Sequence, residues 1–404
     1  MMRKMMALSL FLGTLSGLFG SDIKEPKFPY PHHVKYAHAL MLSKYPQSKL
    51  DQNVAAYYER WKKDFLVKEG NDYRIASDKK DKSRTVSEGQ GYGMMIVAVM
   101  AGYDKDAKEI FDGLYAFAKK HPSEICSRFM TWQVPAKKEE SDSAFDGDAD
   151  IAYALMLAFA QWGEKHYNQD AAILIEALGH KVIGKNSHLP LLGDWVDQNG
   201  KKYNEYTTRT SDFMLSHFRA FYRFTQDKRW LKVIDSTQRA LMAIQNTPHN
   251  HTKLVSDFIY HDKQGYHPTK RNFLEEEDDS YYYNACRVPW RVGLDALLND
   301  DRTSRKISSD MLQWIGKESS HNPQKIMSGY HLSGKVIGDD YTTAAFVAPF
   351  GVAAKASHNQ AFFDAIYEVI KQRHENYFED SINLLSQLIM IGAFWDPTQV
   401  KVRD

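Results

Sequence analysis

Apolar side chains recur at helical spacing along nearly the whole chain, and this periodicity constrains its fold more than any other feature. Strict alternation of apolar and polar residues, which is typical of half-buried strands, is rare. One stripe contains Val54, Tyr57, Trp61 and Phe65. Such windows predict twelve helices, near residues 49–68, 89–102, 105–120, 147–163, 169–183, 211–225, 228–246, 284–299, 302–318, 341–356, 359–372 and 380–394. The chain is therefore expected to be all-α.

The predicted helices fall into adjacent pairs with short links, so they can close into a double ring with six inside and six outside. An open helical solenoid is the alternative, but it should show a sequence repeat of fixed period, and none is visible. Long irregular stretches at 185–210 and 248–283 are rich in aromatic and acidic residues and would suit the rim of a binding cleft. Because no Pro/Ser-rich linker divides the chain, we expect residues 21–404 to form a single domain.

The first 20 residues have the pattern of a secretory signal. Arg3 and Lys4 precede an apolar run that continues to Phe19, and the small residues Gly20 and Ser21 follow it. A membrane-spanning helix needs about 20 apolar residues, so the run is short for a span, and an N-terminal anchor is the alternative. We predict a signal peptide over residues 1–20, no stable membrane span, and a mature protein that is secreted or periplasmic.

Charge and cysteine content exclude several classes of protein. The chain has 52 Lys plus Arg and 51 Asp plus Glu, a net charge of +1, so it lacks the basic field of a nucleic-acid-binding protein. Two cysteines, Cys126 and Cys286, are too few for a disulfide-rich scaffold, and the sequence does not say whether they pair. His249 and His251 lie in a polar loop where solvated histidines are the rule. We predict no metal, no cofactor and a monomer.

Two acidic motifs stand at the start of predicted helices. The first reads Ser-Glu-Gly-Gln-Gly-Tyr-Gly at 87–93, and its glycines allow a backbone or a substrate to approach closely. The alternative role for Glu88 is to cap its helix. The second reads Asp-Gly-Asp-Ala-Asp at 146–150, ahead of an apolar run. A calcium loop would need further ligands that are missing, and capping accounts for one aspartate only, so a catalytic or sugar-binding carboxylate is a further interpretation.

Together the two motifs resemble glycoside hydrolase family 8. The resemblance spans about 85–395 and includes Met-Thr-Trp-Gln at 130–133, Asn-Ala-Cys-Arg-Val-Pro-Trp-Arg at 284–291, and the segments 206–218 and 341–350. One departure is Phe145, where the family usually has Ser or Thr. The resemblance implies an (α/α)6 barrel and inversion of the anomeric carbon. It also implies that Glu88 is the proton donor and that Asp146 belongs to the active centre.

Inverting hydrolysis of a glycoside requires two carboxyl groups with different tasks. An acid protonates the leaving oxygen and a base activates water on the opposite face of the sugar, with the two groups roughly 6.5–9.5 Å apart. The acid must hold its proton at working pH. We therefore expect burial and the nearby Asp146 to raise the pKa of Glu88, outweighing the helix N-terminus, which would lower it.

The identity of the base depends on the branch of the family. In one branch the base is an Asp in Tyr-Asp-x-x-Arg, but that position is Asn284 here, and a neutral amide cannot accept the proton. Another branch has Asn there and takes its base from a Glu in a long loop upstream. Glu275, which follows Phe-Leu, best resembles that residue, and Glu276 and Glu277 compete with it.

Aromatic residues make up 13% of the chain, and part of this surplus is expected to stack on sugars. The flat apolar faces of β-linked sugars pack on Trp and Tyr, while polar neighbours fix the hydroxyl groups. Trp132 is the first candidate, by resemblance. The full set of candidate substrate-binding residues is Trp132, Trp195, Tyr206, Tyr283, Asn284 and Arg287.

The sequence thus predicts an inverting, endo-acting β-1,4-glycoside hydrolase with a polysaccharide or oligosaccharide substrate. The expected substrate is a β-glucan, either cellulose or a mixed-linkage chain. A chitosanase with the same mechanism is the alternative, and xylan is less favoured. Because Asn284 replaces the base of one branch, a non-catalytic carbohydrate-binding protein derived from such an enzyme is a second alternative. A helical interaction scaffold would have no cleft.

Overall fold

The computed structural model describes residues 25–137, 140–338 and 341–400, so the predicted signal peptide lies outside the described residues. Within these ranges the chain is dominated by helices, as its periodicity predicts. The α-helices are α1 (Gln47–Phe65), α2 (Ser87–Met100), α3 (Ala107–Lys120), α4 (Phe145–Trp162), α5 (Lys165–Lys181), α6 (Leu215–Thr225), α7 (Arg229–Gln245), α8 (Val288–Asn299), α9 (Arg302–Glu318), α10 (Ala344–Lys355), α11 (Gln360–Ile370) and α12 (Tyr377–Met390).

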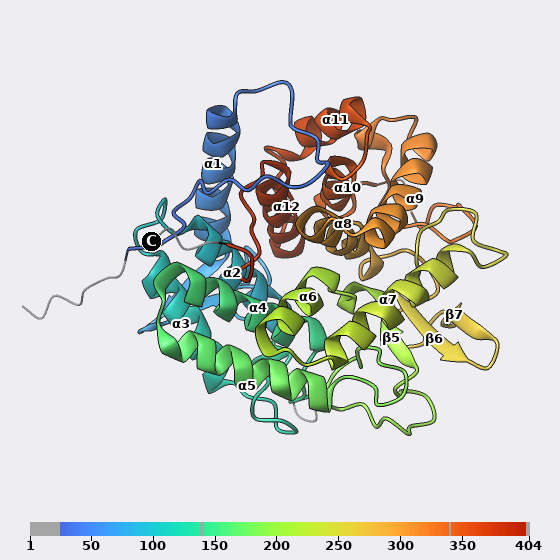
Figure 1. Cartoon of the computed structure of the whole chain (residues 1–404), viewed down its shortest axis with the longest axis horizontal. Coiled ribbons are helices and arrows are strands. Elements are labelled where there is room, and N and C mark those ends of the chain that lie inside the picture. The colour runs from blue at the N-terminus through green and yellow to red at the C-terminus, as the bar shows by residue number, and fades with distance from the viewer. Residues whose placement is uncertain (1–24, 138–139, 339–340, 401–404) are drawn as a thin grey trace, which may run out of the picture.

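The even-numbered helices form a closed inner ring. Each packs on the next in the order α2, α4, α6, α8, α10, α12, and α12 packs back on α2. Each odd-numbered helix packs mainly on one member of this ring: α1 on α12, α3 on α2, α5 on α4, α7 on α6, α9 on α8 and α11 on α10. Figure 1 shows the even-numbered helices at the centre and their partners outside. The architecture is the predicted (α/α)6 barrel.

The distribution of apolar residues explains which helices lie inside. Every residue of α10 is buried, and in α2 all of the 14 residues except Glu88 are buried. In contrast, α9 buries one stripe, which includes Ile307, Met311 and Ile315. A helix that is apolar on all sides belongs in an interior, whereas a single apolar stripe suits a helix with one face in solvent.

Short strands and 3-10 turns occupy the connections, and the sequence analysis did not predict them. One hairpin pairs β1 (Leu66–Glu69) with β2 (Asp72–Ile75), and β3 (Thr85–Val86) pairs with β4 (Gln133–Val134). The two long irregular stretches contribute a three-stranded antiparallel sheet of β5 (Thr207–Arg209), β6 (Phe258–Asp262) and β7 (Gly265–Pro268). The 3-10 turns are η1 (Thr210–Asp212), η2 (Ala285–Arg287) and η3 (Pro323–Lys325).

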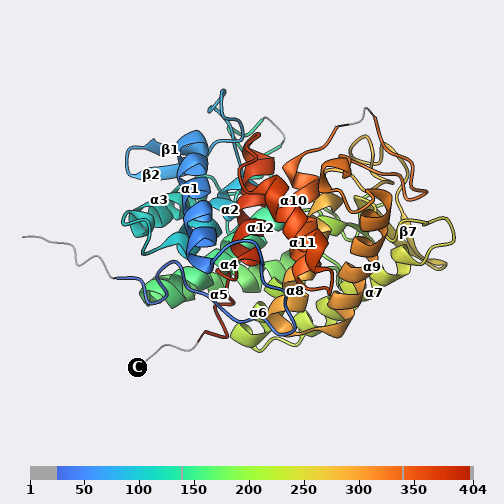
Figure 2. The same ribbon diagram turned by 90° about the horizontal axis from the view of Figure 1, so that it is seen from above.

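The segment 25–46 crosses the end of the ring where the inner helices finish, and Figure 2 shows it in dark blue beside α4, α12 and α10. Its backbone amides donate to carbonyls at four helix ends: Lys27 to Gln161, Tyr30 to Ala101, Val34 to Gly392 and Leu40 to Lys355. Cys126 and Cys286 are free thiols. None of the helices in the described part of the chain combines the length and apolar character of a membrane span.

Candidate active site

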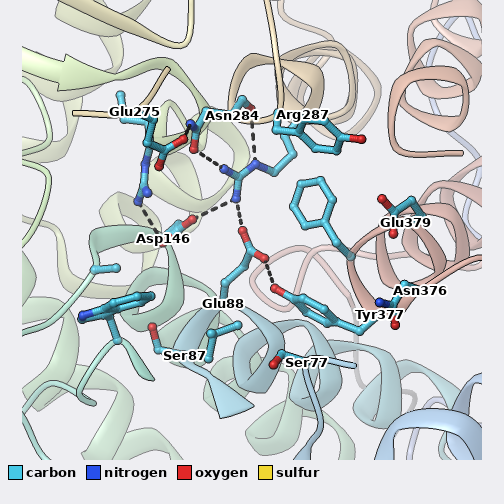
Figure 3. Close-up of a pocket in the computed structure, with 16 residues that line it drawn as sticks. Ser77, Ser87, Glu88, Asp146, Glu275, Asn284, Arg287, Asn376, Tyr377 and Glu379 are labelled. Carbon is cyan, nitrogen blue, oxygen red and sulfur yellow. Dashed lines mark hydrogen bonds and ion pairs between the residues drawn. The ribbon is translucent and has the colours of Figure 1, made fainter. Parts of the chain in front are cut away.

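A cavity of about 440 Å³ lies where several inner helices begin. Glu88 is the second residue of α2, Asp146 is the second residue of α4, and Tyr377 is the first residue of α12. Arg287 directly precedes α8. All four side chains line the cavity, and Figure 3 shows them converging. Because helix N-termini carry partial positive charge, this end of the barrel favours carboxylates.

Two glycines let α2 and α4 approach closely enough to bring the acidic motifs together. A Cβ atom on Gly91 would lie 2.7 Å from the Cβ of Asp150. A Cβ on Gly147 would lie 2.3 Å from the Oγ of Ser87 and 2.7 Å from its carbonyl carbon. Only glycine fits at such backbone contacts. The glycines of both motifs therefore serve the placement of Glu88 beside Asp146.

Two arginines hold Asp146 in its ionised form. Arg287 donates from Nη1 to Asp146 Oδ2 at 3.0 Å, and Arg209 donates from Nη2 to Asp146 Oδ1 at 3.0 Å. Burial raises the pKa of Asp146, but the charges of Arg209 and Arg287 together bring it below its ordinary value. Asp146 is thus a buried, negatively charged acceptor facing the cavity.

The pKa of Glu88 shifts in the opposite direction to that of Asp146. Burial raises its pKa, the Arg287 guanidinium opposes that shift, and the charge of Asp146 adds to it. Tyr377 donates its hydroxyl to Glu88 Oε1 at 2.5 Å, which lowers the pKa, and Arg287 pairs with Oε2. The net direction is upward, as the sequence analysis expects. The carboxyl group of Glu88 therefore bonds to the side chains of Arg287 and Tyr377.

Asn284 connects Arg287 to a second carboxylate. Its Nδ2 donates to Glu275 Oε2 at 3.0 Å, and its Oδ1 accepts from Arg287 Nη2 at 2.9 Å. Asp257 fixes this arrangement, because it accepts backbone N–H groups of Tyr282, Asn284 and Ala285 at 2.8, 2.9 and 2.7 Å. Burial raises the pKa of Asp257 to about 7. Asn284 therefore positions a carboxylate.

Among the three candidate glutamates, the structure brings Glu275 to the cavity. Its backbone N–H is held by Asp278 Oδ2 at 2.9 Å. The side chain of Glu276 is 80% exposed and lies 3.9 Å from Arg271, and Glu277 pairs with the same arginine. Neither Glu276 nor Glu277 lines the active-site cavity.

The aromatic candidates divide into two groups. Trp132 and Tyr283 line the cavity. The pairing of β3 with β4 brings Trp132 next to the start of α2, where its carbonyl accepts the N–H of Ser87 at 2.9 Å. Trp195 and Tyr206 do not line it, since Trp195 packs edge-on against Tyr203 and Tyr206 is 37% exposed. A role for Trp195 and Tyr206 in substrate binding stays a prediction.

Sequence reasoning missed several residues of the cavity, above all Arg209 and Tyr377. Arg209 is 63 residues from Asp146, and Tyr377 is 289 residues from Glu88. The one local signal is Asp212, three residues after Arg209, which accepts from its Nε at 3.1 Å. Further lining residues that were not singled out are Ser77, Asn376, Phe378 and Glu379.

Comparison with known proteins identifies the family. The profile described as "Glycosyl hydrolases family 8" matches residues 28–392. The chain belongs to glycosyl hydrolases family 8. An endoglucanase of Bacillus sp. (strain KSM-330) is 39% identical over 403 residues, covering 95% of this chain and 85% of that protein. A beta-glucanase of Niallia circulans is 37% identical over 380 residues, covering 92% of each.

Solved structures agree with this assignment to family 8. The apo structure of a beta-1,3-1,4-glucanase from Paenibacillus sp. X4 matches with a TM-score of 0.88 and 37% identity, covering 92% of this chain and 100% of that one. A reducing-end-xylose releasing exo-oligoxylanase, 17% identical with a TM-score of 0.73, covers 90% and 97% and shares the fold alone. The family 8 protein is therefore a glycoside hydrolase that acts on carbohydrate chains, not a helical scaffold or a non-catalytic binding protein.

Proposed function

We propose that this hydrolase cleaves internal β-1,4 bonds of cellulose or mixed-linkage β-glucan with inversion. The relatives named endoglucanase, beta-glucanase and beta-1,3-1,4-glucanase support the substrate class. The observation that carries the mechanism is that Glu88 and Glu275 line one cavity. In Figure 3 they lie on different sides of the Arg287 guanidinium. An inverting enzyme needs such a separation to admit sugar and water between acid and base.

Glu88 is the proposed general acid. Its raised pKa favours the protonated form that can protonate the leaving glycosidic oxygen. After the transfer, the new carboxylate is stabilised by Arg287 and by the hydroxyl of Tyr377. The same contacts oppose protonation beforehand, so burial has to outweigh them in the resting site.

Glu275 is the proposed base. Asn284 donates to its Oε2, and no described residue donates to Oε1, which can accept a proton from the attacking water. Asp146 remains ionised and can accept a sugar hydroxyl or oppose the positive charge of the oxocarbenium-like transition state. Trp132 and Tyr283 offer flat faces for neighbouring sugar rings.

A reducing-sugar assay across carboxymethylcellulose, lichenan, chitosan and xylan tests the substrate. The expected result is highest turnover on carboxymethylcellulose or lichenan, with a rapid fall in viscosity that shows internal cleavage. Proton NMR of the fresh hydrolysate tests inversion, because β-linked substrate should release the α-anomer first. Initial release of the β-anomer would overturn the mechanism, and turnover confined to xylan would overturn the substrate.

Chitosan is the second candidate substrate, and one observation favours it. Glu379, a carboxylate outside the proposed acid and base, also lines the cavity and could face a sugar amine. If the wild type hydrolyses chitosan, Glu379→Gln should lower the rate on chitosan more than the rate on lichenan. Equal losses on both polymers would remove Glu379 from this role, and no turnover of chitosan by the wild type would exclude the candidate.

We also propose that the protein is exported, with residues 1–20 as its signal and 21–404 as one catalytic domain. The sequence pattern of the N-terminus and the single closed ring of helices support this. Amino-terminal sequencing of the protein recovered from culture medium or periplasm should begin near Ser21. Recovery of an unprocessed chain with the cell membrane would contradict it.

A further inference from the structure

A second cavity, of about 650 Å³, lies among β7, the segment 246–250 and the segment 331–333. Asp279 and His331 line it. One carboxylate oxygen each from Glu277 and Asp279 and one ring nitrogen of His331 lie within 4.8 Å of one another. These three residues do not line the active-site cavity. The cluster is therefore separate from the proposed catalytic groups, although Glu277 and Asp279 lie on the same loop as Glu275.

Glu277 is a buried member of this cluster, and its two carboxylate oxygens differ in their partners. It is 6% exposed, and Arg271 pairs with its Oε1. Its Oε2 is buried and has no hydrogen-bond partner among the described residues. A buried carboxylate oxygen without a partner is unfavourable, because it has lost its hydration without compensation. A bound cation would supply the missing interaction.

Hydrogen bonds of Ser280 determine which ring nitrogen of His331 can bind a cation. Its hydroxyl lies 2.9 Å from Asp279 Oδ1 and 2.9 Å from His331 Nδ1. Because a hydroxyl donates one hydrogen, donation to Asp279 requires His331 to donate from Nδ1, and the lone pair is then on Nε2. A metal-binding histidine is usually held in this way, through a hydrogen bond from its other ring nitrogen.

The charges around the cluster also favour a cation. Arg271 lies near both Glu276 and Glu277, and Asp279 adds a third carboxylate. One arginine balances one of these three negative charges. A divalent cation would balance the remainder, and the open cavity lined by Asp279 and His331 gives it a path from solvent.

We propose that Glu277, Asp279 and His331 bind one divalent transition-metal cation, for which Zn²⁺ is the probe. A set of one imidazole and two carboxylates matches the ligands of zinc, whereas Ca²⁺ and Mg²⁺ prefer oxygen ligands alone. The bound ion would tie the loop 270–283 to the segment 328–338, which the bridge between Tyr281 and Tyr330 already joins. Since Glu277 follows Glu275 by two residues, the ion would also steady the proposed base.

Isothermal titration of the untagged whole chain, treated with EDTA and then dialysed, tests the binding. The expected result is one equivalent of Zn²⁺ with weaker binding of Ca²⁺. Asp279→Asn and His331→Gln should each weaken Zn²⁺ binding by at least about 10-fold. His249→Gln is the matched control, because His249 lines the same cavity outside the cluster and its loss should leave the affinity unchanged.

Thermal melts provide a readout that does not depend on catalysis. Zn²⁺ should raise the melting temperature of the wild type and of His249→Gln, and it should not raise that of Asp279→Asn. Circular dichroism checks that the variants are folded. If the wild type shows no saturable heat of Zn²⁺ binding, the proposed site is wrong. It is also wrong if His249→Gln loses as much Zn²⁺ affinity as the cluster variants. Tighter binding of Ca²⁺ that needs Asp279 would overturn the assignment to transition metals.

One part of this proposal rests on the proposed function, namely the link by which the bound ion steadies Glu275 as the base. If the site exists and the link is correct, Zn²⁺ should protect the loop 270–283 from proteolysis and raise kcat in the wild type but not in Asp279→Asn. Binding without any change in kcat would overturn the link and leave the site. Loss of activity in Glu275→Gln with unchanged Zn²⁺ affinity separates the two proposals.

Discussion

Asn284 occupies the position at which one branch of the family has its base. Its side-chain amide forms a hydrogen bond with a carboxylate instead of acting as one. It donates to Glu275 and accepts from Arg287, so the amide stands between the loop acid and the arginine that contacts Glu88. An aspartate in its place would repel Glu275 at this distance. An asparagine rather than an aspartate at position 284 is therefore chemically consistent with a base at Glu275.

The first prediction concerns the choice of base. Glu275→Gln should lower kcat on lichenan by about 100-fold or more, because an amide cannot accept the proton of water. Glu276→Gln is the control, since this side chain is 80% exposed and points to Arg271, and it should keep most of the activity. A stopped reducing-sugar assay with both purified variants measures the difference. If Glu276→Gln loses activity while Glu275→Gln retains it, Glu276 and not Glu275 is the base.

The second prediction concerns the pH profile set by Glu88. The Tyr377 hydroxyl donates to Glu88 and lowers its pKa, so Tyr377→Phe should raise that pKa further. An acid is active while protonated, and activity is lost as pH rises through its pKa. The alkaline limb of kcat should therefore move to higher pH in Tyr377→Phe. On the acidic plateau kcat should fall by less than the roughly 100-fold expected for Glu88→Gln. An alkaline limb that stays in place or moves to lower pH would contradict this.

Residues that carry a local pattern could be predicted from the sequence, and residues defined by long-range contacts could not. Glu88 and Asp146 stand in glycine-rich motifs at helix starts, and the resemblance of these motifs to family 8 makes them candidates. Arg209 and Tyr377 belong to no acidic motif of this kind, and they reach Asp146 and Glu88 only when the fold brings distant segments together. Trp195 is a candidate only as an aromatic residue in a long loop; it packs against Tyr203 outside this cavity, so its role in substrate binding stays a prediction.

At the scale of elements, helical periodicity located all twelve helices to within a few residues. The first predicted helix ran to residue 68, but α1 ends at Phe65 because β1 begins there. The two-residue turn at Gly70 and Asn71 between β1 and β2 is a local hairpin signal that the helix pattern obscured. The pairing of β5 with β6 joins residues about 50 positions apart, so no local pattern marks it.

The third prediction tests the contact between α2 and α4. Gly147→Ala should destabilise the protein by about 1–3 kcal/mol, because the added Cβ meets the backbone of Ser87. It should also lower kcat, since Ser87 precedes Glu88. Gly316→Ala in α9 is the control, because its Cβ would meet side chains and no backbone, with His321 at 3.0 Å and Phe362 at 3.5 Å, and alanine favours helix. Urea unfolding and lichenan turnover measure both effects. Equal behaviour of the two variants would contradict this account of the glycines.

At the scale of the molecule, the two ends of the ring differ in chemistry. The end where inner helices begin carries the carboxylates and arginines of the cavity. The end where they finish is crossed by the segment 25–46, which contacts the ends of α2, α4, α10 and α12. Lys355 lies at this second end and donates to the carbonyls of Leu40 and Met390 at 2.9 Å each. Carbonyl oxygens at helix C-termini attract a cation.

The fourth prediction follows from the burial of Lys355. Burial lowers its pKa from 10.5 to about 8, so the unfolded chain binds a proton that the folded chain lacks between these two values. Stability must therefore rise with pH across this window, since unfolding takes up a proton there. From pH 7 to pH 10 the free energy of unfolding of the wild type should gain about 2 kcal/mol relative to Lys355→Met.

The comparison with Lys355→Met removes the contribution of other groups that titrate in the same range. Urea unfolding of both proteins at pH 7, 8, 9 and 10 measures the difference between their free energies of unfolding. Lys371, whose pKa is raised, gives a matched control, because Lys371→Met should show no gain of the wild type over the variant in this window. Parallel pH dependence of the wild type and Lys355→Met would mean that the fold does not lower the pKa of Lys355, and would contradict this prediction.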